Sequence, residues 1–183
     1  GYSLLKKKRD GLILEFFEIL KKAKSLRGEM VTAYLAAEGA INLARALEGD
    51  GAVMSASTAS SGNPQVNVTH KNIVGVVVPR IEAPSLRRTM LERGLGTYTP
   101  SAIIESAEKY EALGEIILKV AEIETSMRRL IDEIEKTKRK VNALEFTVIP
   151  QLDKQQQLIS FRLQEMERDN FVRLKLIKAR LAG

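Results

Sequence analysis

Clusters of basic side chains are the residues of this 183-residue chain whose type and spacing suggest chemistry. Long cationic side chains can pair with carboxylates on another surface, although an exposed ion pair contributes only ~0–1 kcal/mol. The clusters therefore predict either a weak, adaptable contact with an acidic partner or an ordinary solvated helix face. They comprise Lys6, Lys7, Lys8 and Arg9 near the start of the chain, and Arg128, Arg129, Lys136, Lys138, Arg139 and Lys140 far downstream.

Residues suited to catalysis or metal binding are scarce. The sequence has no Cys and a single His, so thiolate sites and clusters of His ligands are excluded. We place that histidine, His70, in a turn. No Gly-Lys-Ser/Thr motif stands at the spacing of a phosphate-binding loop. The carboxylates show only the i,i+4 pairing that is common on helix surfaces. We therefore predict no catalytic residue, no metal and no cofactor, and a chain that is not itself an enzyme.

The overall charge argues against two further classes of protein. The net charge of +6 comes from 29 basic and 23 acidic residues, which are interleaved along the chain. A nucleic-acid-binding protein more often gathers its basic residues on one face with stacking aromatics. No run of about 18 apolar residues is present that could cross a bilayer. We predict no nucleic-acid partner and no direct membrane insertion.

Two apolar stripes recur along the sequence in steps of three and four. The first is Leu12, Phe16, Ile19, Ala23, Leu26, Met30, Ala33, Ala37, Ala40, Ala44 and Leu47. The second is Met127, Leu130, Ile134, Thr137, Val141, Leu144 and Val148. This spacing keeps each stripe on one side of a helix, as at the a and d positions of a coiled coil. The two stripes predict helices that fold back on each other as a long antiparallel pair.

A break between the stripes predicts three segments. Residues 1–49 form an N-terminal coiled-coil helix, residues 50–100 a middle insert, and residues 101–183 a long C-terminal coiled-coil helix. Pro150 conflicts with that last helix, because it removes a backbone hydrogen bond at a cost of ~3 kcal/mol. The apolar pattern nevertheless resumes at Leu152, so we expect a continuing helix with a kink near Pro150. The kink is either a built-in bend that gives the long helix an off-axis shape or an irregularity that the fold tolerates.

The middle insert changes from helical to strand-like spacing. Residues 52–64 are small and polar and predict a loop, whereas residues 65–69 and 73–78 are rich in β-branched residues and predict two strands. With His70, Lys71 and Asn72 as the connection and Pro79 as the boundary, they form a β-hairpin over about residues 65–79. Its valines, Val76, Val77 and Val78, are candidate contacts for a partner, and the alternative is a local lid over the Ala-rich helix surface.

The rest of the insert is expected to be irregular. A short helical turn over residues 85–92 is expected within it. Thr99 is suited to cap the long helix, with Pro100 at its first position. Altogether the sequence predicts a mainly α fold: a long antiparallel two-helix coiled coil with a small β-hairpin insert in the middle of the chain.

Several motifs resemble the D subunit of the V-type and archaeal A-type rotary ATPases and ATP synthases. They are Leu4-Leu5-Lys6-Lys7-Lys8-Arg9-Asp10, Glu15-Phe16-Phe17, Lys138-Arg139-Lys140-Val141-Asn142-Ala143-Leu144-Glu145, Val148-Ile149-Pro150 and the basic and apolar alternation of residues 171–178. The resemblance covers nearly the whole chain and is weakest over residues 50–99.

The resemblance implies a non-catalytic rotor component of the central stalk. Such a component couples ATP hydrolysis or synthesis in a catalytic head to ion translocation through a membrane ring. The implied partners are the head hexamer of A and B subunits, the small F subunit of the stalk and an adaptor of the membrane ring. The implied location is cytoplasmic, peripheral on the cytoplasmic side of a membrane. The basic clusters would then face acidic groups of the head. The alternative is a static coiled-coil scaffold or tether of another complex.

Overall fold

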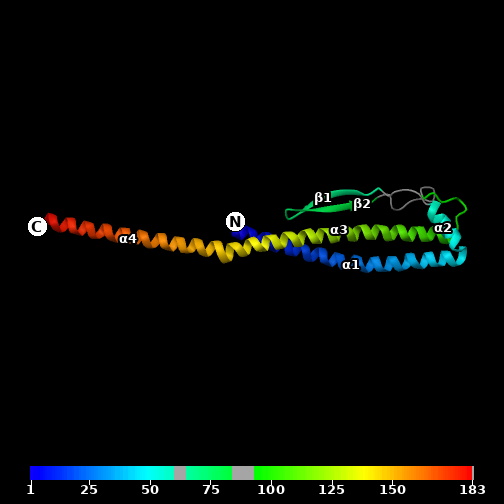
Figure 1. Ribbon diagram of the computed structural model, residues 1–183, viewed down its shortest axis with the longest axis horizontal. Helices are drawn as coiled ribbons and strands as arrows, with labels where there is room; N and C mark the ends of the chain where they lie inside the picture. Colours follow the sequence, from blue (N-terminus) through cyan, green and yellow to red (C-terminus); the bar gives the residue numbers. More distant parts are fainter. Residues whose placement is uncertain (60–64, 84–92, 183) are drawn as a thin grey trace. The chain divides into compact units, whose positions relative to one another are not determined.

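The computed structural model describes residues 1–59, 65–83 and 93–182, and it is dominated by helices (Figure 1). A two-stranded antiparallel sheet, β1-β2, lies in the middle of the chain. The predicted mainly α fold with a β-hairpin is therefore confirmed. The elements are α1 (Tyr2–Glu48), α2 (Asp50–Ala59), β1 (Asn67–Ile73), β2 (Val76–Glu82), α3 (Ser101–Ala143), the π-helix η1 (Leu144–Val148) and α4 (Ile149–Ala182).

The chain forms two compact units. Residues 8–135 form the larger unit, and residues 1–7 together with residues 136–183 form the smaller one. The larger unit contains the hairpin, α2 and most of α1 and α3. The predicted division into segments 1–49, 50–100 and 101–183 stays a prediction.

Helices α1 and α3 lie side by side and antiparallel within the larger unit (Figure 1). Ion pairs join them from Lys8 to Glu133 at 2.9 Å and from Arg27 to Glu124 at 2.8 Å. Every residue of the first apolar stripe from Leu12 to Ala44 is buried or half-buried, whereas Leu47 is exposed. Burial of this stripe stabilises a long helix whose own glycines weaken it.

Helix α2 corrects the prediction of a loop over residues 52–64. Residues 50–59 are helical, and residues 60–64 lie outside the described part of the chain. Gly49 ends α1 with a φ of +84°, a left-handed conformation that glycine adopts readily. Asp50 then stands in the first turn of α2, where a carboxylate favours the helix start. Val53 and Ala56 are half-buried, so the short helix has an inner side.

The hairpin forms with a different turn from the predicted one. Ile73 pairs with Val76, so the turn is Val74-Gly75, and His70 lies inside β1 rather than in the connection. Gly75 donates its N–H to the Asn72 side-chain oxygen at 2.7 Å, which fixes the turn from within. The prediction was wrong because strand-like residues continue through 70–72 and strand periodicity alone does not mark the turn.

Pro79 lies within β2 and does not bound it. It stands opposite His70, three pairs from the turn. Because hydrogen-bonded and non-hydrogen-bonded pairs alternate along an antiparallel ladder, the pair His70–Pro79 is a non-hydrogen-bonded one. The missing N–H of Pro79 therefore removes no bond between the strands.

The cap of α3 lies one residue later than the predicted cap at Thr99. The helix begins at Ser101, directly after Pro100. The Thr99 hydroxyl donates a hydrogen bond to the Gly96 carbonyl at 2.7 Å and so shapes the turn that precedes the helix. The helical turn expected over residues 85–92 lies outside the described residues.

In the smaller unit, the helix widens just before Pro150 and then continues as α4. Residues 144–148 form a π-helix, and Ile149 donates its N–H to the Leu144 carbonyl, five residues back. The wide turn accommodates a proline that lacks its own N–H. The helical path changes direction there, as expected for a kinked continuing helix (Figure 1).

The π-turn also ends the burial of the second stripe. Thr137 and Val141 are buried, and Leu144 is half-buried, but Val148 is exposed. Residues 151–182 are exposed on every side of the helix. No residue of α4 is buried in the described part of this unit, Ile149–Ala182.

Candidate functional site

The hairpin is the feature of the larger unit that departs from a simple helix pair, and it packs on both helices. Val76 and Val78 of β2 are buried in one cluster with Leu12 of α1 and Leu130 of α3. Partly buried residues surround this cluster: Phe16, Ile19, Ile73 and Ile134. The hairpin thus covers the line where the two helices meet.

A polar contact fixes the same strand to α3. Arg129 donates a hydrogen bond from Nη1 to the carbonyl of Val77 at 2.9 Å. In the ladder, Val77 belongs to a non-hydrogen-bonded pair, so its carbonyl points away from β1 and toward the helix. The Val77 side chain is half-exposed, whereas Val76 and Val78 are buried. Of the three candidate valines, only Val77 presents its side chain to solvent.

A buried ion pair attaches the end of the insert to α3. Arg93 donates from Nε and Nη2 to the two carboxylate oxygens of Glu111, at 2.7 and 2.9 Å. The side chains are only 7% and 14% exposed. Two parallel hydrogen bonds between a guanidinium and a carboxylate fix both position and orientation. This pair anchors the return of the chain into α3.

Helix α3 therefore has a second contact surface that the sequence does not reveal. Glu111 binds Arg93, Arg129 binds the hairpin, and Ser126 is buried with its hydroxyl bonded to the Glu122 carbonyl. These residues are polar, so they add nothing to the apolar periodicity from which a buried helix face is predicted. Arg129 is itself exposed, and its contact, like that of Glu111, becomes recognisable only once its partner is known.

The residues of the basic cluster near the start of the chain, 6–9, differ in their contacts. Lys6 lies over the Tyr2 ring, with Nζ 4.8 Å from the centroid. Lys8 pairs with Glu133 across the helices, and Arg9 pairs with its neighbour Asp10 at 3.2 Å. Lys7 is exposed. Part of the cluster thus stabilises the fold.

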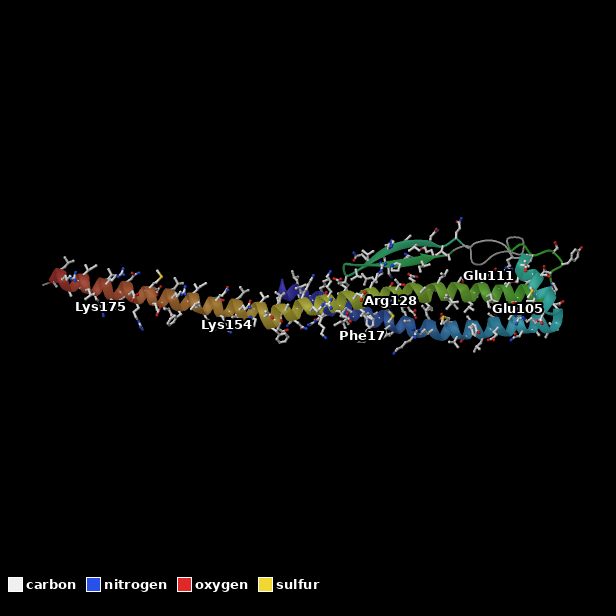
Figure 2. All side chains as sticks on the ribbon, in the orientation of Figure 1. Phe17, Glu105, Glu111, Arg128, Lys154 and Lys175 are labelled. Carbon is white, nitrogen blue, oxygen red and sulfur yellow. The ribbon has the colours of Figure 1, made fainter. Side chains whose placement is uncertain are left out.

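The downstream basic residues are mostly at the surface. Arg128 is exposed beside the inward-bonded Arg129, and in the smaller unit Lys138, Arg139 and Lys140 are exposed. Figure 2 shows charged side chains projecting from the helices, among them Glu105 and Arg128 on α3 and Lys154 and Lys175 on α4. The charges of both signs make a surface suited to weak polar contacts.

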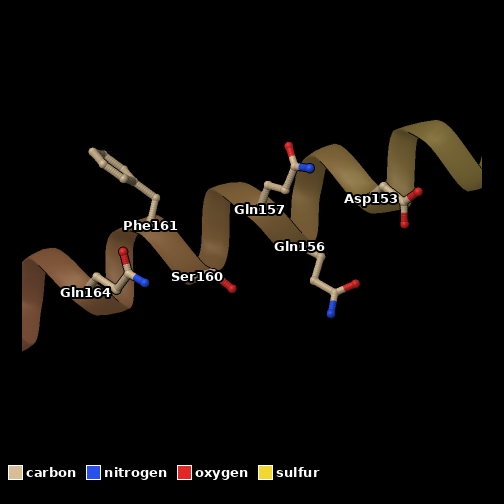
Figure 3. Close-up of a pocket in the computed structure, with 6 residues that line it drawn as sticks. All are labelled: Asp153, Gln156, Gln157, Ser160, Phe161 and Gln164. Atoms are coloured by element: carbon tan, nitrogen blue, oxygen red, sulfur yellow. The ribbon is translucent and has the colours of Figure 1, made fainter.

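One hollow on the surface of the smaller unit does not resemble a small-molecule site. It is lined by Asp153, Gln156, Gln157, Ser160, Phe161 and Gln164, all from α4, and Figure 3 shows these side chains spreading from a single helix. A binding pocket normally encloses most of its ligand, and one helix cannot supply opposing walls.

Neither a metal site nor a membrane-spanning helix is found in the described part of the chain. No group of three or more His, Cys, Asp or Glu side chains there is arranged to hold a metal ion. Within the same residues, no helix has the length and apolarity needed to cross a membrane.

Comparison with known proteins identifies the family. The sequence model of the ATP synthase D subunit matches residues 1–179. The D subunit of the A-type ATP synthase of Methanosarcina mazei is 50% identical over 182 residues, which is 99% of this chain and 87% of the relative. The corresponding protein of Methanosarcina acetivorans is 51% identical over the same shares of the two chains. That of Archaeoglobus fulgidus is 47% identical over 100% of this chain and 88% of its own length. The resemblance found in the motifs is thereby confirmed, and the chain belongs to the family of ATP synthase D subunits.

Proposed function

We propose that this chain is the non-catalytic rotor shaft in the central stalk of an A-type ATP synthase. In this role it couples ATP hydrolysis or synthesis in a catalytic head to ion translocation through a membrane ring. Its partners are the head hexamer of A and B subunits, the small F subunit and an adaptor of the membrane ring. It works on the cytoplasmic side of the membrane as a peripheral part of the complex.

The observation that carries this proposal is the continuous packing of α1 against α3. A shaft must transmit torque without unfolding, and the buried stripe from Leu12 to Ala44 supports α1 over most of its length. Ion pairs tie the helices at two separated levels, Lys8–Glu133 and Arg27–Glu124. Helices held in this way resist twisting relative to each other better than a single helix does.

The exposed basic residues are the proposed contacts with the head. Lys7, Arg128, Lys138, Arg139 and Lys140 are exposed. Lys8 and Arg129, the latter also exposed, bind partners within the larger unit. Exposed pairs of long side chains bind weakly, so they can exchange partners as a shaft turns. The hairpin is the proposed regulatory contact, through the exposed Val77 side chain.

A reversible cross-link separates a turning shaft from a static tether. The chain has no Cys, so a cysteine introduced at Lys140 is unique within it. With a second cysteine on a facing protein of the head, oxidation of the assembled complex should stop ATP hydrolysis, and reduction should restore it. Complexes that carry only one of the two cysteines provide the control. Full hydrolysis by a quantitatively cross-linked complex would show that the chain does not turn and would favour a scaffold.

A further inference from the structure

The turn of the hairpin contains a residue that is unfavourable for it. Val74 has a φ of 50°, and Gly75 has a φ of 84°. A two-residue hairpin turn with both angles positive favours Asn-Gly or Gly-Gly. A β-branched residue with positive φ is an outlier, and such strain persists only where surrounding contacts maintain it.

Besides the Asn72 hydrogen bond within the turn, Val74 has a neighbour on α1. The Val74 Cγ1 atom is 3.8 Å from the position that a Cβ would take on Gly11. Glycine is itself unfavourable in the middle of a helix, and Gly11 lies next to the buried Leu12. Two locally unfavourable residues therefore lie next to each other, and a Cβ at Gly11 would touch Val74 at ordinary contact distance.

The rest of the hairpin depends on few contacts. All residues of β1 except Ile73 are exposed. The hairpin is attached through Ile73, the buried β2 residues Val76, Val78 and Pro79, and the Arg129 hydrogen bond. A two-stranded hairpin is at best marginally stable alone in water. Elements with few buried contacts open at a lower free energy than the rest of a protein. Loss of the tip contact would therefore shift the hairpin measurably toward release.

We propose that Val74 seated over Gly11 is a latch that sets the balance between a docked and a released hairpin. In the docked state Leu12 and Leu130 are covered, and in the released state they and the inner face of β2 become accessible. Because the latch joins two elements of the larger unit, it operates whether or not the chain turns in a complex.

The test measures hairpin docking in the full chain, with one substitution on the hairpin and one on α1. Spin labels on cysteines at the exposed positions Lys71 and Glu15 report the distance from hairpin to α1. Val74→Asn suits the turn but removes the apolar contact, and it should raise the released fraction about tenfold. Gly11→Leu fills the seat from the helix side and should release the hairpin without any change in its own sequence.

Matched substitutions on the same helix provide the controls. A Cβ on Gly39 meets nothing within 4 Å, so Gly39→Leu should leave the distance distribution as in the parent chain. Gly11→Ala places its methyl group at ordinary contact distance from Val74 and should keep the hairpin docked. The proposal is overturned if Val74→Asn and Gly11→Leu both leave the distance unchanged, or if Gly39→Leu releases the hairpin as strongly as Gly11→Leu. Circular dichroism of each variant confirms that the helices persist.

Discussion

Arg129 binds the carbonyl of Val77, a residue 52 positions earlier in the chain, through a hydrogen bond of 2.9 Å. The bond connects α3 to the edge of β2 that faces away from β1. Together with the cluster of Leu12, Val76, Val78 and Leu130, it joins hairpin and helices into one structure. Polar and apolar contacts therefore hold the same strand.

Removal of the Arg129 guanidinium should loosen the hairpin selectively. Arg129→Ala is expected to lower the free energy of hairpin opening by about 1 kcal/mol, the usual net contribution of one hydrogen bond. Hydrogen exchange of the β1 and β2 amides measures this. The neighbouring Arg128 is exposed, so Arg128→Ala is the control and should leave the exchange rates unchanged. Equal acceleration by both substitutions would mean that overall charge, and not the bond to Val77, is responsible.

The ion pair Arg93–Glu111 should contribute far more than the ion pairs at the surface. Its side chains are nearly buried, and loss of one partner of a buried pair costs about 3–5 kcal/mol. Arg93→Ala should therefore lower the free energy of unfolding by an amount of this order in urea titrations. Arg27→Ala, which breaks the exposed pair with Glu124, should cost ~0–1 kcal/mol.

A double substitution then separates the burial of charge from the loss of packing. Arg93→Met combined with Glu111→Leu removes both charges and should recover much of the stability that Arg93→Ala loses. A double variant as unstable as the single one would show that packing around Arg93, rather than an unpaired carboxylate, explains the loss.

The helices could be predicted from the sequence because the same apolar spacing recurs at every turn of the helix. The stripe from Leu12 to Ala44 gives one apolar residue at each turn, and every one of these residues is buried or half-buried. An irregular turn next to Pro150, seen as the π-helix over Leu144–Val148, is expected from the sequence because proline removes a particular hydrogen bond wherever it stands in a helix. A repeated apolar pattern and the covalent structure of proline can both be read without knowledge of the tertiary contacts.

The hairpin turn and the contacts of α3 could not be predicted in the same way. Val74-Gly75 is a poor match to the residues that favour its turn, and the neighbour of Val74, Gly11, belongs to another element. The bonds Arg129–Val77 and Arg93–Glu111 join polar residues that show no periodicity. α2 was missed because its Gly, Ser and Thr residues favour turns and helix caps over helix interiors. In each case the deciding partner lies elsewhere in the chain.

A charge buried in the cluster beneath the hairpin should separate α1 from α3 there. Leu130 is completely buried, and Leu130→Asp removes its packing and places a carboxylate without a partner in the cluster. We expect a loss of about 4 kcal/mol or more and a lower melting temperature by circular dichroism. Ile131 is the adjacent residue and is exposed, so Ile131→Asp should have little effect. Similar melting of the two variants would mean that the stripe is assigned to the wrong side of α3.

Replacement of Pro150 should let the π-turn close into ordinary α-helix. Pro150→Ala restores an N–H and removes the clash with the preceding turn, a combination that favours helix by ~3 kcal/mol in a regular interior. The π-turn already relieves part of this, so the gain in stability should be smaller. Slower amide exchange over residues 144–150 would report the closure. Unchanged exchange would indicate that packing of Leu144 and Val141, and not the proline, keeps the turn wide.

The outer surface of the hairpin should influence ATP hydrolysis if it is a regulatory contact. Val77 is half-exposed while its neighbours Val76 and Val78 are buried, so Val77→Asp alters the outer surface and leaves the cluster with Leu12 and Leu130 intact. In a complex reconstituted with the catalytic head, this variant should change the rate of ATP hydrolysis at least twofold without a change in the melting temperature of the free chain. Val68 on β1 is similarly exposed. A changed rate with Val77→Asp alone would place the contact at β2, whereas a changed rate with Val68→Asp as well would involve both strands. An unaltered rate with both variants, in complexes shown to contain the chain, would remove the hairpin from the coupling and leave it as a cover over the helix pair.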